Sequence, residues 1–308
     1  MAASPTPTLV LVPEWGTGHL MSMLDSCKRI LLCGGRALSI TLLVMRPPTA
    51  QATSEVEAHV RREAASGLDI RFHRLPAVEP PADAAGVEEF IARYIQLHAP
   101  HVRDAVAGMS CPVAVLVLDL FAAPMVDVAR DLGVPSYVFM SSTGAMLALM
   151  LHLPVLHQVV TVEFSQVDGD VVHVPGLPPI PPESMPCTVV DKKSAGWCSV
   201  LESLWHGLPM VPWPLYAEQH LNAFELVADM GVAVPLKVDR KRDNLVEAAD
   251  LERAVKCLMG DEGRKARERA AGMRDICRNA VNKGGSSDAA LQRLSEALHH
   301  GAVLPPTM

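Results

Sequence analysis

The sequence has few aromatic residues, no excess of positive charge and no long hydrophobic run. Phe, Trp and Tyr make up 4% of its 308 residues, so a core has to come from aliphatic side chains and methionine. The formal net charge is −7, which leaves no basic surface for phosphates and argues against a nucleic-acid partner. The apolar stretches 113–126 and 144–156 are interrupted by Asp119 and His152, and both are too short for a membrane span.

Paired cysteines and zinc-type spacings are absent as well. The seven cysteines form no CxxC pair and have no histidine at zinc-ligand spacing, so we expect reduced thiols and no metal site. The N-terminus has no positively charged region, and its apolar run is too short for a signal peptide. Together these features favour a cytoplasmic location. We interpret His299 and His300 as a polar tail.

The first half of the chain alternates between apolar runs and helical periodicity. We expect strands at 8–13, 38–45, 69–76, 113–121 and 135–140. Helices are expected at 19–32, 54–65 and 87–107, and a further helix follows the fourth strand and ends at 131. Apolar strands separated by helices indicate a parallel sheet that is covered on both faces. The predicted fold class is therefore doubly wound α/β, in which ligands bind at the carboxyl ends of the strands.

The second half has too few strands for a complete domain of this kind. The proline-rich segment 171–186 is predicted to be a loop or linker, and the alternative is a proline-rich docking ligand. After residue 196 we expect strands at 209–213 and 232–236, with helices at 199–205, 218–230, 247–258, 263–281 and 287–298. Two strands cannot form a sheet that is covered on both faces, so part of this domain is missing before Gly196.

Two polar residues stand where a doubly wound fold places its chemistry. His19 follows the first strand across a glycine-containing loop and begins a helix, whose dipole keeps the ring neutral and able to accept a proton. The alternative is a loop histidine without a role. Asp119 ends a very apolar strand, where a carboxylate needs a partner. The alternative is an aspartate that only caps the helix after it.

Several long motifs resemble one family. "GWCSVLESLWHGLPMVPWPLYAEQHLNAFELV" resembles the C-terminal two-thirds of the UDP-sugar box of plant secondary-product glycosyltransferases. "LVPEWGTGHLMSMLDSCKRIL", "VLVLDLF" and "VPGLPPIPPESMP" are similar to the phenolic and flavonoid branch of the same family. The resemblance covers nearly the whole chain in two blocks, 1–193 and 196–308.

The resemblance implies a fold and a reaction. The fold is of the GT-B type, with two Rossmann-like domains: an acceptor-binding domain at 1–193 and a partial UDP-sugar-binding domain at 194–308. The reaction is the inverting transfer of glucose from UDP-glucose to a hydroxyl of a small phenolic or flavonoid acceptor, without a metal or another cofactor. His19 matches the catalytic base of the family, and Asp119 matches the carboxylate that orients it.

The donor contacts follow from the same resemblance. Glu202 would accept from the ribose hydroxyls, and Ser199 would contact the diphosphate near a helix N-terminus. The full set of implied UDP-sugar residues is Trp197, Ser199, Glu202, Trp213, Glu218 and Gln219. The alternatives are that Glu202 and Glu218 are solvated helix residues and that Trp213 belongs to the core.

The start of the box departs from the family. Its Trp-x-x-Gln segment is absent, Ser194 and Ala195 stand where His-Cys is expected, and Cys198 replaces an asparagine. We interpret this as an internal deletion joined between Ser194 and Trp197, from a skipped exon, a genomic deletion or a wrong gene model. The lost contacts would weaken donor affinity about a hundredfold or more.

Two other functions are weighed against this transferase. The alternative is a weak or inactive truncated variant that retains only acceptor binding. A serine or metallo-hydrolase is set aside because the sequence has neither GxSxG nor HExxH.

Overall fold

The computed structural model describes residues 6–33, 38–84, 86–159, 171–186, 197–215 and 218–301. The chain forms two compact units, Met1–Ser141 with Lys283–Met308, and Ser142–Asn282. These units do not coincide with the predicted division at 193/194, because the first unit ends at Ser141 and because Lys283–Met308 also belongs to it. The assignment of 1–193 to an acceptor domain and of 194–308 to a donor domain stays a prediction.

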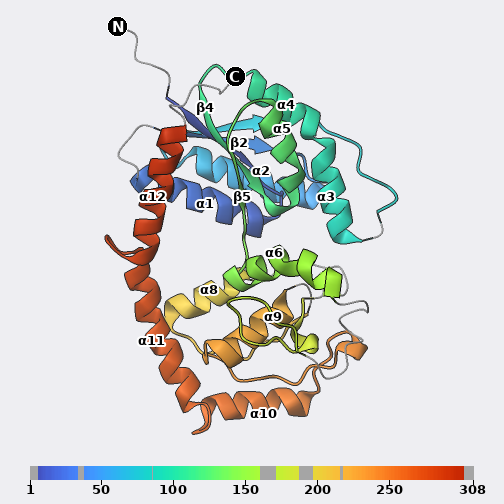
Figure 1. The fold of residues 1–308 in the computed structure, drawn as a ribbon, viewed down its shortest axis with the longest axis vertical. Helices are drawn as coiled ribbons and strands as arrows, with labels where there is room; N and C mark the ends of the chain where they lie inside the picture. Colours follow the sequence, from blue (N-terminus) through green and yellow to red (C-terminus); the bar gives the residue numbers. More distant parts are fainter. Residues whose placement is uncertain are drawn as a thin grey trace. The chain divides into compact units, whose positions relative to one another are not determined.

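The first unit is built on a five-stranded parallel sheet (Figure 1). The strands are β1 (Thr8–Val12), β2 (Ser39–Val44), β3 (Ile70–Arg74), β4 (Val113–Asp119) and β5 (Ser136–Phe139). Their order is β3-β2-β1-β4-β5, which is the doubly wound order that the sequence predicts. The order reverses between β1 and β4, and this is where such folds bind ligands.

Both faces of this sheet are covered by helices, as its continuous apolar strands require. Leu9 and Leu11 of β1 pack on the face formed with α1 (Thr17–Cys33), α2 (Ala50–Ala64) and α12 (Ser286–Gly301). Val10 and Val12 alternate with them and pack on the opposite face. That face is covered by α3 (Val87–Leu97), α4 (Ala99–Ala107) and α5 (Val126–Asp131).

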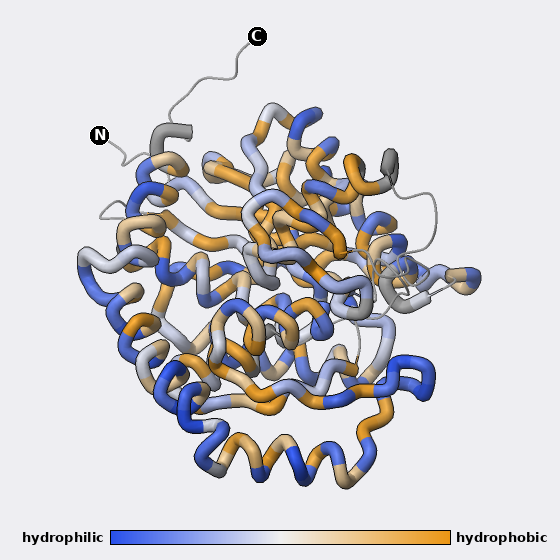
Figure 2. Tube along the Cα trace, turned by 60° about the horizontal axis from the view of Figure 1, so that its bottom comes forward, coloured by the Kyte–Doolittle hydropathy of each residue, from blue (hydrophilic) through white to orange (hydrophobic). Residues whose placement is uncertain are grey.

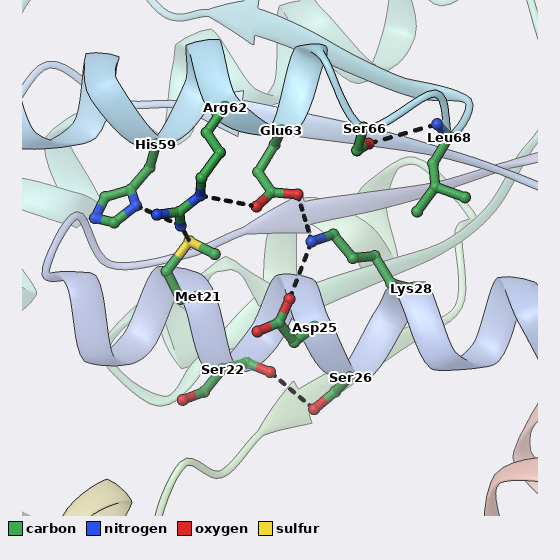
Figure 3. A network of polar contacts seen from close by, with 10 residues as sticks. All are labelled: Met21, Ser22, Asp25, Ser26, Lys28, His59, Arg62, Glu63, Ser66 and Leu68. Atoms are coloured by element: carbon green, nitrogen blue, oxygen red, sulfur yellow. Dashed lines mark hydrogen bonds and ion pairs between the residues drawn. The ribbon is translucent and has the colours of Figure 1, made fainter.

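A polar network joins α1 and α2 where they pack side by side (Figure 3). Lys28 of α1 pairs with Asp25 at 3.0 Å and with Glu63 of α2. Glu63 is only 6% exposed, so its carboxylate needs this partner. Arg62 approaches Glu63 at 3.5 Å from the solvent side. The network satisfies a buried charge between the two helices.

One predicted helix is wrong: the segment 87–107 forms two helices. His98 ends α3 and also begins α4, with Pro100 in the first turn of α4. Proline has no N–H group to continue the hydrogen-bond ladder of α3, so the chain restarts its helix at this point. His98 itself is fully buried at the junction.

The second unit is largely helical in its described residues. It contains α6 (Gly144–Val159), α8 (Trp197–His206), α9 (Gln219–Phe224), a π-helical turn (Glu225–Asp229), α10 (Ala248–Met259) and α11 (Arg264–Val281). Figure 2 shows hydrophobic and hydrophilic positions alternating along helices of the chain. This alternation is typical of helices that pack on one side only.

The two strands predicted for this unit are wrong. Within the described residues, the segments 209–213 and 232–236 meet only in one parallel bridge, between Met210 and Ala233. Two backbone hydrogen bonds hold it, from Met210 N–H to Val232 and from Val234 N–H to Met210. A strand needs neighbours along its length, and two short segments alone supply too few.

The helices α8 and α11 pack closely against each other in the second unit. Leu204 of α8 and Ala270 of α11 are buried in one apolar cluster. Gly207 ends α8 with φ +71°, and an added Cβ there would lie 3.1 Å from Cβ of Arg274 on α11. Glycine therefore serves both the turn and the close approach of the helices. Across the described ranges, no helix is long and apolar enough to cross a membrane.

We expect Leu116→Ala to destabilise the first unit by about 2–5 kcal/mol, because it leaves a cavity at a fully buried position of the central sheet. Leu32→Ala is the matched control, since Leu32 is 72% exposed on α1. Urea unfolding of both variants measures the difference. Equal losses of stability in the two variants would contradict the described core.

Candidate active site

The candidate site is built by the pairing of β1 with β4. The two strands run parallel, with Val12 opposite Leu118, so their carboxyl ends lie at one edge of the sheet. Asp119 is the last residue of β4, and the loop after β1 leads into α1. His19 lies in the first turn of α1, where its N–H donates to the Gly16 carbonyl at 3.1 Å. The topology thus brings His19 and Asp119 to the point where strand order reverses.

The two side chains form a direct hydrogen bond. His19 Nδ1 lies 2.8 Å from Asp119 Oδ2, and the Ser141 hydroxyl lies 3.3 Å from the same nitrogen. The Asp119 side chain is fully buried, whereas the His19 side chain is 20% exposed. A carboxylate only accepts, so this pairing places the ring proton on Nδ1 and the lone pair of the neutral ring on Nε2. This is the tautomer that a general base needs.

Asp119 has both of the roles considered for it. Its Oδ1 accepts from the Phe121 N–H at 2.9 Å and caps the 3₁₀ turn Leu120–Met125. Its Oδ2 is the atom that pairs with His19. The cap holds the carboxylate in one orientation, and the Phe121 ring lies 5.6 Å from the His19 ring, centroid to centroid. The alternative of a cap without a partner is therefore excluded.

Glu14 belongs to this site, and the sequence analysis missed it. It lies in the loop after β1 and is only 5% exposed. Its carboxyl folds over the next turn, so that a Cβ added to Gly16 would lie 2.5 Å from Glu14 Oε2. Burial raises the pKa of Glu14; the charge of His19 and the Gly16 amide oppose this, and Asp119 adds to it. The signal for Glu14 that the sequence offered was an acidic residue directly after Pro13, which follows the last residue of β1.

The six predicted donor residues all lie in the second unit. Trp197, Ser199 and Glu202 belong to α8, with Ser199 in its first turn, but their side chains lie outside the described structure. Trp213 is 44% exposed, so it is not a core residue. Glu218 precedes α9, and Gln219 begins it. Gln219 Oε1 accepts from the Leu215 N–H at 2.8 Å.

No group of three or more His, Cys, Asp or Glu side chains in the described ranges is arranged to hold a metal ion.

We expect Glu14→Gln to stabilise the protein at pH 7.5 by roughly 2–4 °C in Tm and to leave Tm unchanged near pH 4. The folded-state pKa of Glu14 is raised above the ordinary value of 4.5, so the unfolded chain loses this proton first. Stability is therefore lost as pH rises from 4.5 through the raised pKa. Thermal unfolding at both pH values measures the difference.

Glu79→Gln is the control, because Glu79 is exposed. A Glu14→Gln variant that is less stable than wild type at both pH values would contradict the burial of an ionisable carboxyl at this position.

Comparisons with known proteins show which family the chain resembles. The family model "UDP-glucoronosyl and UDP-glucosyl transferase" matches residues 192–269. "Malvidin galactosylase UGT88C3" of Oryza sativa subsp. indica is 34% identical over 477 residues, covering 96% of this chain and 99% of that protein. "Flavonol 3-O-glucosyltransferase UGT71C4" of Arabidopsis thaliana is 24% identical over 475 residues, covering 96% and 98%.

A solved structure shows the fold. Medicago truncatula UGT71G1 complexed with UDP-glucose superimposes with a TM-score of 0.84 at 21% identity, covering 95% of this chain and 98% of that chain. The Oryza alignment runs over 477 positions against 308 residues here, so 477 minus 308, or at least 169, of its positions have no residue from this chain. The predicted GT-B fold is thereby confirmed, and the unmatched positions are consistent with a shortened chain. The chain belongs to the plant UDP-glycosyltransferase family.

Proposed function

We propose that this UDP-glycosyltransferase transfers glucose from UDP-glucose to a hydroxyl of a small phenolic or flavonoid acceptor. The observation that carries the proposal is the His19–Asp119 pair at the strand-order reversal of the first unit. The names of relatives support the acceptor class, since they include a malvidin galactosylase and a flavonol 3-O-glucosyltransferase. Residues 1–193 would bind the acceptor, and 194–308 would bind the donor.

The proposed step is a single displacement that needs no metal. His19 Nε2 takes the proton of the acceptor hydroxyl while that oxygen forms a bond to the anomeric carbon of glucose. The bond from this carbon to the β-phosphate oxygen breaks, and UDP leaves with the electron pair from the opposite side. The anomeric configuration is therefore inverted. Asp119 stabilises the imidazolium that forms, as in other carboxylate–histidine pairs.

The donor site is proposed from the second unit. The helix α8 would present Ser199 to the diphosphate at its N-terminus, where amides and the helix dipole favour anions. Glu202 would bind the ribose hydroxyls, Trp197 would line the same site, and Trp213, Glu218 and Gln219 would contact the sugar. We also propose a cytoplasmic location, on the basis of the scattered cysteines.

A second candidate is a weak or inactive variant that retains only acceptor binding. The 169 or more unmatched alignment positions and the single bridge between 209–213 and 232–236 favour it. So does Asn222, which is 2% exposed while neither polar atom of its amide has a hydrogen-bond partner in the described structure. Buried amides are rarely left unpaired, so Asn222 is typical of a domain that has lost neighbouring segments.

Transfer from labelled UDP-glucose to a panel of phenols tests the proposal directly. We expect measurable glucoside formation by the purified chain and a decrease of ~10²–10⁴-fold in His19→Ala, because the base is removed. Asp119→Asn should lose a similar factor, because an amide favours the wrong tautomer of His19. His73→Ala, which changes an exposed histidine of β3, should keep full activity.

The outcomes separate the two candidates. The truncated variant would be supported if circular dichroism shows a folded chain that binds phenols but transfers no glucose. Transfer that survives in His19→Ala would overturn the proposed base. A parallel reaction with UDP-galactose decides the sugar, because one relative is named a galactosylase.

A further inference from the structure

A tight loop in the second unit has an unusual backbone. After the 3₁₀ turn Arg240–Arg242, Asp243 and Asn244 both adopt left-handed conformations, with φ of 54° and 59°. The loop closes through an antiparallel bridge between Asp239 and Leu245, where the Asp239 N–H donates to Leu245 at 2.9 Å. Two consecutive left-handed residues that are not glycine are costly, and such costs persist where a function or the surrounding structure requires them.

Three hydrogen bonds converge on Asn244 from one segment of the chain. The Trp213 indole N–H donates to the Asn244 carbonyl at 3.0 Å. The Asn244 side-chain amide donates to the Leu215 carbonyl at 2.7 Å. Its amide oxygen lies 3.0 Å from Nε2 of His220. The main-chain carbonyl and both ends of the side chain therefore bind Trp213, Leu215 and His220.

These contacts fix the orientation of the amide. A carbonyl only accepts, so the nitrogen of Asn244 has to face Leu215 and its oxygen has to face His220. Nε2 of His220 then carries the ring proton. Burial, together with the charge of Arg240, lowers the pKa of His220 to about 4, so the ring is neutral near pH 7. Aspartate at position 244 would place an acceptor against the Leu215 carbonyl.

The residues that Asn244 binds include one proposed sugar contact, Trp213, and a neighbour of another, Gln219. Leu215 is fixed on both sides, by Gln219 at its N–H and by Asn244 at its carbonyl. Trp213 is 44% exposed, so packing alone does not fix its ring. Its indole N–H is held by the Asn244 carbonyl. The positions of Trp213 and Gln219 thus depend on the loop that contains Asn244.

We infer that Asn244 is a positioning residue for sugar recognition, holding Trp213 directly, and Gln219 through Leu215, in place for the hexose of the donor. The inference rests on the proposed function of this segment. Because Asn244 acts on sugar contacts, its loss should weaken the binding of UDP-glucose more than the binding of UDP. A residue that only stabilises the fold would affect both ligands alike.

The chain offers a matched pair of variants. Asn244→Gly keeps the left-handed backbone at no cost and keeps the carbonyl, but it removes both side-chain hydrogen bonds. Asp243→Gly changes the neighbouring left-handed residue, which is exposed. Among the described residues, the Asp243 side chain makes no hydrogen bond. Circular dichroism and Tm verify that both variants fold.

Isothermal titration with UDP-glucose and with UDP gives the test. We expect Asn244→Gly to raise Kd for UDP-glucose about tenfold, because Leu215 and with it Gln219 lose their side-chain support, and to change Kd for UDP less than about twofold. Asn244→Asp should match or exceed this loss, and Asp243→Gly should match wild type for both ligands.

Each contrary outcome has one meaning. Equal weakening of both ligands in Asn244→Gly, or no weakening of either, would overturn the inference while the donor site stands. A folded wild-type chain that binds neither ligand would instead overturn the proposed donor site, and with it the role of Asn244.

Discussion

The candidate chemistry of the chain depends on the hydrogen bond between His19 and Asp119, which lie 100 residues apart in the sequence. The bond forms because β1 and β4 pair in parallel with their carboxyl ends aligned. The buried apolar residues on both faces of the sheet stabilise that pairing, and the cap to Phe121 N–H fixes the carboxylate. A shift in the β1–β4 register would move Asp119 away from the ring.

Much of the first unit could be predicted from the sequence, because its strands are strongly apolar and its helices are periodic. The ends of β1 and β4 lie within two residues of the prediction, and this accuracy is what identified His19 and Asp119. Glu14 was not predicted, because its burial depends on how the loop turns back over Gly16. The break at His98 was missed although Pro100 signals it, because the apolar period continues through the junction.

The second unit shows where sequence patterns stop being sufficient. Pro209–Trp213 and Val232–Leu236 have strand composition, but a strand also needs partners, and here they form only one bridge. Asn222 is buried, and neither polar atom of its amide has a hydrogen-bond partner in the described structure. The role of Asn244 depends on three contacts between distant segments, and no local pattern announces such a convergence.

The central claim is that His19 and Asp119 form a stable hydrogen-bonded pair in this chain, whatever its second unit binds. Proton NMR of the folded wild-type protein tests this most directly through the Nδ1 proton of His19. We predict a downfield, slowly exchanging resonance that is lost in Asp119→Ala and retained in Glu14→Gln, with the fold of both variants verified by circular dichroism. A wild-type spectrum without this resonance, or one unchanged in Asp119→Ala, would contradict the account.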